Sequence, residues 1–83
     1  MNQSGSERKE IHRFEKNSLE EVRVSLTTYK GREYIDLRVF FQGGDGEMHP
    51  GKRGLTIRLD LLPDLETAIL KLREASGPQR EDR

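Results

Sequence analysis

The sequence predicts an α+β fold in which antiparallel strands come first and a single helix follows. Two segments, 22–28 and 33–41, alternate apolar and polar residues, which is the period of a half-buried strand. A third segment, 54–59, alternates in the same way. After residue 60 the apolar residues recur every three or four positions, the period of an amphipathic helix. This order is typical of a sheet whose apolar face packs on a helix.

The length allows one small domain. The chain has 83 residues, and a domain of that size buries only a modest fraction of its surface. Residues 1–10 and 76–83 lack apolar periodicity, so we expect disordered tails there and a folded domain over residues 11–75. A core this small is marginal in a single copy, which favours a homodimer.

The first two strands are expected to form a hairpin. Between them, Lys30-Gly31 is typical of a tight turn, because glycine adopts positive φ without steric cost. A further short strand is expected over 11–15. The apolar face of the hairpin is predicted to carry Val22, Val24, Leu26, Ile35, Leu37 and Val39.

The remaining strands are interrupted by turn residues. Residues 42–46 are predicted to form a glycine-rich turn, and 47–49 a short edge strand that Pro50-Gly51 ends. The strand over 54–59 is expected to place Leu55, Ile57 and Leu59 on its inner face.

The helix is expected to run from Asp60 to about Glu74. Asp60 is a suitable capping residue, and Pro63 is tolerated in a first turn, whose N–H groups have no partner within the helix. Gly77-Pro78 would close it. One helix covers only part of such a sheet in a two-layer unit, which again favours dimerisation. The apolar stripe assigned to the core or the dimer interface is Leu62, Leu65, Ile69 and Leu72.

Composition excludes several classes of function. The chain has no cysteine and therefore no disulfide or thiolate metal site, and no apolar run approaches the length of a membrane span. His12 and His49 are isolated, so neither a metal ion nor a cofactor is expected. Without an N-terminal apolar signal, we expect an intracellular protein, in the cytoplasm or nucleoid of a bacterium or the nucleus of a eukaryote.

The stretch GEMHPGKRG at 46–54 resembles a nucleotide-binding loop but lacks its essential parts. Arg53 stands where such a loop has Ser or Thr to hold magnesium, and the following segment alternates as a strand rather than opening a helix. Asp45 and Glu47 lie in a flexible turn with no nucleophile beside them, which argues against an enzyme.

The charge distribution instead favours nucleic acid. Net charge is zero, but residues 21–58 carry seven Lys or Arg against five acids. Aromatic residues alternate with these cations, the pattern of proteins that stack bases and hold phosphates of single strands. By alternation Phe40 faces outward with Arg38 while Phe41 joins the inner face. The candidate contact residues are Arg23, Thr27, Tyr29, Lys30, Arg32, Arg38, Phe40, Phe41, Lys52 and Arg53.

Four pieces in order resemble the positive cofactor four transcriptional coactivator family in its compact bacterial form. They are Tyr29-Lys30-Gly31-Arg32, Ile35-Asp36-Leu37-Arg38, Phe40-Phe41 and the 46–54 stretch. The resemblance implies a strongly curved four-stranded antiparallel sheet followed by a helix. It also implies a homodimer whose grooves bind unpaired DNA with little sequence preference, in transcription or in the handling of melted DNA.

The resemblance also places the aromatic DNA contact at Phe41, against the alternation, and a bulge would reconcile the two. Phe41 stands where the family often has tryptophan, His49 where it often has lysine, and Thr27-Thr28 where charged residues occur. These changes predict weaker attraction for phosphates. Two alternatives remain: an adaptor that contacts proteins of a transcription or repair complex, and a binder of single-stranded RNA.

Overall fold

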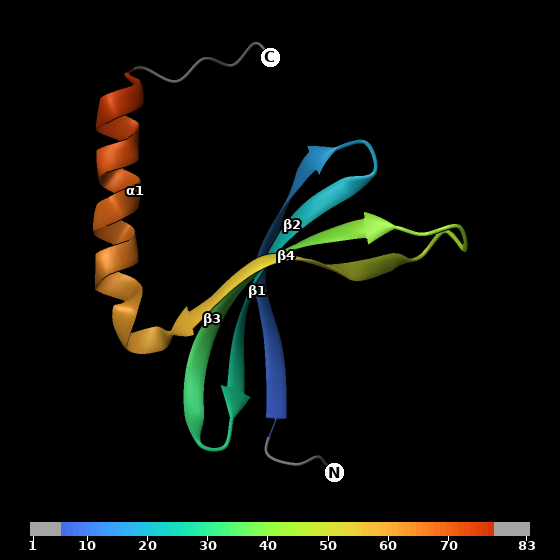
Figure 1. Cartoon of the computed structure of the whole chain (residues 1–83), viewed down its shortest axis with the longest axis horizontal. Helices are drawn as coiled ribbons and strands as arrows, with labels where there is room; N and C mark the ends of the chain where they lie inside the picture. Colours follow the sequence, from blue (N-terminus) through green and yellow to red (C-terminus); the bar gives the residue numbers. More distant parts are fainter. Residues whose placement is uncertain (1–5, 78–83) are drawn as a thin grey trace.

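A computed structural model describes residues 6–77 of the chain, which form one sheet and one helical arm (Figure 1). The outer parts of the two expected tails, residues 1–5 and 78–83, lie outside the described residues. The elements in order are β1 (Ser6–Asn17), β2 (Glu20–Tyr29), β3 (Arg32–Gln42), β4 (Met48–Arg58), the 3₁₀ turn η1 (Leu59–Leu61) and α1 (Leu62–Ser76).

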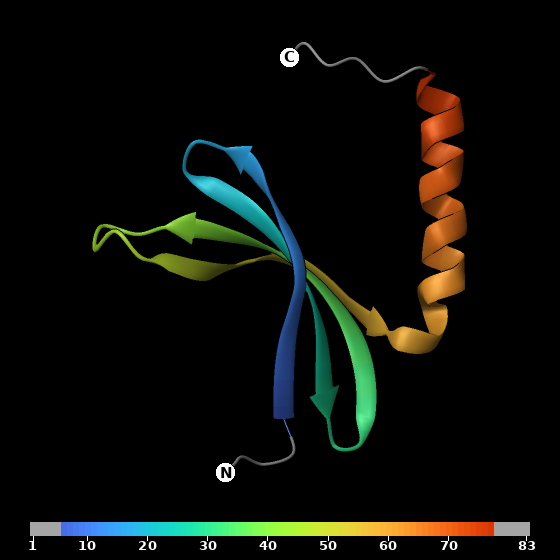
Figure 2. The ribbon, with the colours of Figure 1, turned by 180° about the vertical axis from the view of Figure 1, so that it is seen from behind.

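The sheet is an antiparallel meander, with the strands side by side in the order β1-β2-β3-β4. In the views of Figures 1 and 2 the strands overlap near their middles and fan apart toward both ends, because the sheet is strongly twisted. The predicted fold class, a curved four-stranded antiparallel sheet followed by one C-terminal helix, is confirmed.

Strand β1 is longer than the short segment expected over 11–15. It begins at Ser6, inside the range assigned to the N-terminal tail, and pairs with β2 from Ser6↔Tyr29 to Asn17↔Glu20. Two register shifts, next to Glu10 and Glu15, break its alternation. Because β1 is an edge strand and is exposed over residues 7–17, backbone pairing rather than apolar patterning defines it.

Strand β4 is continuous across the Pro50-Gly51 pair, so the prediction of two separate strands was wrong. Pro50 is tolerated because β4 is the other edge of the sheet, where a missing N–H need not break the ladder. The register passes from Arg38↔Gly54 to Phe40↔Pro50, so three residues of β4 oppose Val39 alone. We call residues 51–53 the β4 bulge.

The two faces of the sheet differ in chemistry. Val24 and Leu37 are directly opposite each other on the apolar face, whereas Ser25 and Asp36 are opposite each other on the second face. Ile35 is the buried apolar side chain of the described residues, while Leu55 on the apolar face is 48% exposed. One copy of the chain therefore leaves much of its apolar face uncovered.

The helix begins differently from the prediction but ends close to the expected place. Asp60 does not cap it: the N-cap is Leu61, without a side-chain hydrogen bond, and Asp60 instead accepts a hydrogen bond from Arg58 Nη2 at 2.9 Å. Pro63 does lie in the first turn, and Gly77 closes the helix after Ser76, with a φ of 72° that is favourable only for glycine.

Helix α1 projects away from the sheet instead of covering it, so the two-layer packing expected within one chain was wrong (Figures 1 and 2). Its apolar side chains are consequently exposed: Ile69 is 53% and Leu72 67% accessible. No helix of the described residues has the length and apolarity needed to cross a membrane.

Candidate nucleic-acid interface

The tip of the β2–β3 hairpin presents an aromatic ring among cations. Lys30 and Gly31 both have positive φ, 53° and 78°, so they form the tight turn expected from the sequence, and Tyr29 pairs directly with Arg32. The Lys30 Nζ lies 5.3 Å from the centre of the Tyr29 ring. Tyr29 is 50% exposed, which leaves a flat surface for a ligand.

A shallow cleft of about 230 Å³ runs from this tip across all four strands on the second face, which we call the cleft face. Thr27 from the candidate set lines it, together with Tyr29 and Arg38. The complete lining is Glu7, Arg8, Thr27, Thr28, Tyr29, Asp36, Arg38 and Thr56.

The floor of the cleft is a buried carboxylate. Asp36 is 2% exposed and accepts hydrogen bonds from Arg38 Nη2 at 2.9 Å, Thr56 Oγ1 at 2.7 Å and Arg8 Nη1 at 2.9 Å. Burial would raise the pKa of Asp36, but these hydrogen bonds and the charge of Arg38 outweigh it, and the pKa falls to about 2. Asp36 is therefore ionised at neutral pH and compensates much of the local positive charge.

Arg38 is consequently a paired cation. Besides Asp36, its Nη1 donates to the backbone carbonyl of Gly51 at 3.1 Å. The sequence made Arg38 a candidate contact for phosphate. The geometry gives it an ion pair with Asp36 of the same strand and a hydrogen bond to Gly51 of β4.

Arg23 and Phe40 also contact each other on the cleft face. The Arg23 guanidinium carbon lies 4.2 Å from the centre of the Phe40 ring, a cation–π contact. Arg23 forms ion pairs with Glu21 and, at 3.7 Å, with Glu10, and its side chain is 19% exposed. One face of Phe40 is thus covered, and the charge of Arg23 is compensated by the two carboxylates.

The β4 bulge carries two exposed cations, Lys52 and Arg53. Lys52 forms no hydrogen bond or ion pair with any described residue. Arg53 acts on Glu20, whose pKa is lowered chiefly by a hydrogen bond from Lys16, then by one from Asn17, and less by the Arg53 charge. The bulge requires close backbone contact: a Cβ on Gly51 would lie 2.9 Å from the Val39 carbonyl oxygen.

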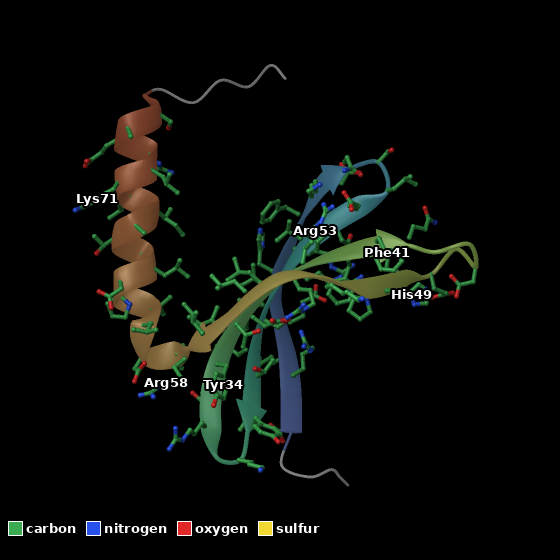
Figure 3. The ribbon with its side chains drawn as sticks, viewed as in Figure 1. Tyr34, Phe41, His49, Arg53, Arg58 and Lys71 are labelled. Atoms are coloured by element: carbon green, nitrogen blue, oxygen red, sulfur yellow. The ribbon has the colours of Figure 1, made fainter. Side chains whose placement is uncertain are left out.

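Phe41 and His49 form a second aromatic group, on the β3–β4 hairpin (Figure 3). The two residues are register partners, and their ring centres lie 5.9 Å apart. His49 Nε2 also contacts Asp45 Oδ1 at 3.1 Å. Phe41 is 41% exposed, whereas Phe40 is half-buried.

The candidate residues therefore lie at several places along the sheet and not in one group. Tyr29, Lys30 and Arg32 stand at one end of β3, and Phe41 stands near the other, about 30 Å away at 3.3 Å per residue. The β2–β3 register is regular, so Phe40 lies on the cleft face and Phe41 on the apolar face, as alternation predicted. The bulge that was expected to reconcile them lies in β4, where it does not turn Phe41 over.

Arg8 is a residue of the cleft that sequence reasoning missed. It lies in a segment without alternation that was assigned to the tail. Its pairing with Thr27 and its hydrogen bond to Asp36 arise only when the strands are brought together in the folded sheet.

The described residues contain no cluster of three or more His, Asp or Glu side chains placed to hold a metal ion.

Known proteins resemble this chain in both sequence and fold. The family model described as Transcriptional Coactivator p15 (PC4) matches residues 16–68. Two crystal forms of a PC4 homolog from Burkholderia pseudomallei K96243 are similar to the chain at 30% sequence identity. The tetragonal form has a TM-score of 0.73 over 80% of this chain and 97% of that one, and the orthorhombic form 0.71 over 87% and 93%.

Proposed function

Because the chain belongs to the transcriptional coactivator p15 (PC4) family, we propose that it binds single-stranded or melted DNA with little sequence preference, as a homodimer and a regulator of transcription. The resemblance seen in the sequence is confirmed by the family match. The members of this family bind nucleic acid and are not enzymes. A DNA-binding role related to transcription therefore follows from membership.

The observation that carries the proposal is the pairing of exposed rings with exposed cations at both ends of β3. Tyr29 lies beside Lys30 and Arg32, and Phe41 lies on the hairpin that carries the β4 bulge. Bases of any sequence stack on such rings, and the neighbouring cations attract the phosphates between them. Neither ring is enclosed by the rest of the described chain, since both are at least 41% exposed.

The homodimer is supported by apolar surface that one copy cannot cover. The apolar face is open at Leu55, and Ile69 and Leu72 of the α1 stripe are exposed, so covering these surfaces with a second copy would complete the core. Within a dimer, the separated aromatic groups of the two copies would contribute to longer grooves than one chain provides.

Fluorescence anisotropy with a labelled single-stranded oligonucleotide of mixed sequence tests this function. Replacing Lys52 and Arg53 together by alanine should reduce the slope of log affinity against log salt by about 1.4, since each cation that neutralises a phosphate contributes about 0.7. The matched control is Lys71→Ala/Arg73→Ala on α1, which removes the same charge away from the sheet and should leave the slope unchanged. Equal slopes for both double variants would contradict the assigned interface.

RNA and protein partners are distinguished in the same system. A single-stranded RNA of the same sequence that competes equally would widen the proposed ligand to both nucleic acids. Failure of every oligonucleotide to bind, together with a protein partner retained after nuclease treatment, would replace the proposal with an adaptor role.

A further inference from the structure

The Arg38 side chain has little capacity left for a ligand. Its Nη2 donates to Asp36 Oδ1 at 2.9 Å and approaches Thr56 Oγ1 at 3.4 Å, its Nε reaches Asp36 Oδ2 at 3.3 Å, and its Nη1 donates to the Gly51 carbonyl. All three guanidinium nitrogens are engaged, and the side chain is only 22% exposed. A phosphate would have to displace partners that already satisfy the charge.

One of these hydrogen bonds supports the β4 bulge. Residues 51–53 oppose Val39 alone, so they lack the regular ladder partners of the rest of the strand. Among the described residues, Arg38 is the one whose side chain hydrogen-bonds to this segment, through the Gly51 carbonyl. The guanidinium also lies against Gly54, where an added Cβ would be 2.9 Å from its carbon. Arg38 therefore contacts the first residue of the bulge and lies beside Gly54, the residue that follows the bulge.

Asp36 fixes the orientation of Arg38. The carboxylate is buried and is held from three strands, by Arg8 of β1, Arg38 of β3 and Thr56 of β4. A planar guanidinium bound by two of its nitrogens to one carboxylate has a fixed direction, which a lysine at the same place would not have. The buried pair thus aims the third nitrogen at Gly51.

We infer that Arg38 is a positioning residue, which Asp36 orients so that it holds the β4 bulge in the shape that presents Lys52 and Arg53 to the nucleic acid. This inference rests on the proposed function. It assigns the phosphate contacts to the two bulge cations and gives the buried Asp36–Arg38 pair the task of holding their backbone.

Asp36→Asn gives effects of opposite sign for the two possible roles of Arg38. The substitution removes a negative charge from the cleft, so a phosphate-binding Arg38 would bind single-stranded DNA as well as before or more tightly. A positioning Arg38 is no longer oriented, because the asparagine NH₂ group cannot accept a hydrogen bond from a guanidinium. We expect weaker binding and a salt slope lower by about 1.4, so the decrease in affinity between 50 and 200 mM salt is about sevenfold smaller than in the wild type.

Arg38→Lys keeps the charge but removes the planar guanidinium that binds Asp36 through two nitrogens. It provides a second, milder variant should Asp36→Asn fold poorly. We expect the same reduction in slope, whereas a cation that acted by charge alone would keep it. The matched control for Asp36→Asn is Asp60→Asn. It raises the net charge by the same amount, at the exposed Arg58–Asp60 pair, and should leave the slope unchanged. The folded fraction of each variant is measured by thermal unfolding, and partial unfolding lowers the active concentration without changing the slope.

A double-mutant cycle completes the test. Adding Lys52→Ala/Arg53→Ala to Arg38→Lys should give no further decrease in slope, because both changes act on the same two phosphate-binding cations. Additive decreases, or an unchanged slope in both Arg38→Lys and Asp36→Asn, would overturn the inference. The proposed function would still stand as long as the wild type binds single-stranded DNA. Absence of wild-type binding would instead overturn the proposed function itself.

Discussion

At the scale of single residues, Asp36 is the most constrained group of the described chain. It is a buried acid on the cleft face of a sheet with few buried side chains, and its charge is stabilised by hydrogen bonds from three side chains. A buried charge that is deprived of one partner is costly, whereas the complete network is stable. The stability of the sheet should therefore depend on the ionisation of Asp36.

Acid should destabilise the protein through this residue. The pKa of Asp36 is about 2 in the folded chain, below the ordinary value of 3.8, so its ionisation favours folding above about pH 4. That contribution, about 2 kcal/mol, disappears as the pH falls from 4 toward 2. Urea unfolding at pH 7 and pH 3 measures the decrease, and Asp36→Asn should remove most of it. An equal decrease in wild type and variant would contradict this role.

The two adjacent phenylalanines should separate binding from stability. Phe41→Ala should weaken single-stranded DNA binding roughly 5- to 150-fold, the equivalent of one stacked base, with little change in stability. Phe40→Ala should lower stability by about 1–3 kcal/mol, because it removes a half-buried ring and its contact with Arg23. Anisotropy and thermal unfolding of both variants check the assignment. Weaker binding only in Phe40→Ala would reverse it.

At the scale of elements, β4 combines a proline, two glycines and, in its bulge, two cations in one strand. The glycines allow the strand to approach β3: a Cβ on Gly54 would lie 2.7 Å from the Leu37 carbonyl oxygen, and one on Gly51 would be nearly as close to that of Val39. In the stretch that resembles a nucleotide-binding loop, Gly51 and Gly54 thus allow contact between two backbones, whereas Gly46 adopts a positive φ of 83°.

Gly54→Ala should therefore destabilise the sheet by about 1–3 kcal/mol, because either the backbone or the Arg38 guanidinium must move. Gly44→Ala is the matched control, since a Cβ there has no atom within 4 Å. Thermal unfolding should give a clearly lower midpoint for Gly54→Ala and a nearly unchanged one for Gly44→Ala. Equal midpoints would show that β4 has room to adjust.

Prediction from sequence succeeded where a pattern is local. The strands β2 and β3 alternate because one face of each is apolar, and the Lys30-Gly31 turn follows from the freedom of glycine. It failed for β1, which has no alternation, and for β4, where Pro50-Gly51 was interpreted as an end of the strand. Edge strands tolerate proline and need no apolar pattern, so these errors have a common cause.

The candidate site was predictable to the same degree. Alternation placed Phe40 with Arg38 and Phe41 opposite, as the register has them. The pairing of Arg38 with Gly51 and of Arg8 with Asp36 joins residues 13 and 28 positions apart. Such pairings depend on how the strands are arranged in space, and the local alternation of apolar and polar residues does not predict that arrangement.

At the scale of the whole molecule, one copy of the chain is too extended to enclose a complete hydrophobic core. Its radius of gyration is 15.2 Å, against about 12 Å for a compact domain of this length. The helix α1 stands apart from the sheet (Figure 2), and Ile69 and Leu72 of its apolar stripe are exposed. These features agree with the proposed homodimer, in which a second copy would cover both surfaces.

The dimer should dissociate when the stripe of α1 receives a charge. Ile69→Glu should shift the protein from dimer to monomer in sedimentation equilibrium, because an unpaired carboxylate would be buried in the interface. Thr67→Glu adds the same charge on the opposite side of the helix, at about 100° per residue, and should remain dimeric. A monomeric wild type, or equal behaviour of the two variants, would contradict the proposed interface.

The most direct test of the central claim is a competition for the wild-type protein between single-stranded and duplex DNA of one sequence at two salt concentrations. Stacking on Tyr29 and Phe41 requires unpaired bases, so the single strand should compete much more strongly at both concentrations. Both affinities should fall with salt, since the phosphates are held by cations. Equal competition by the duplex would contradict the claim that exposed rings of this sheet receive the bases of an unpaired strand.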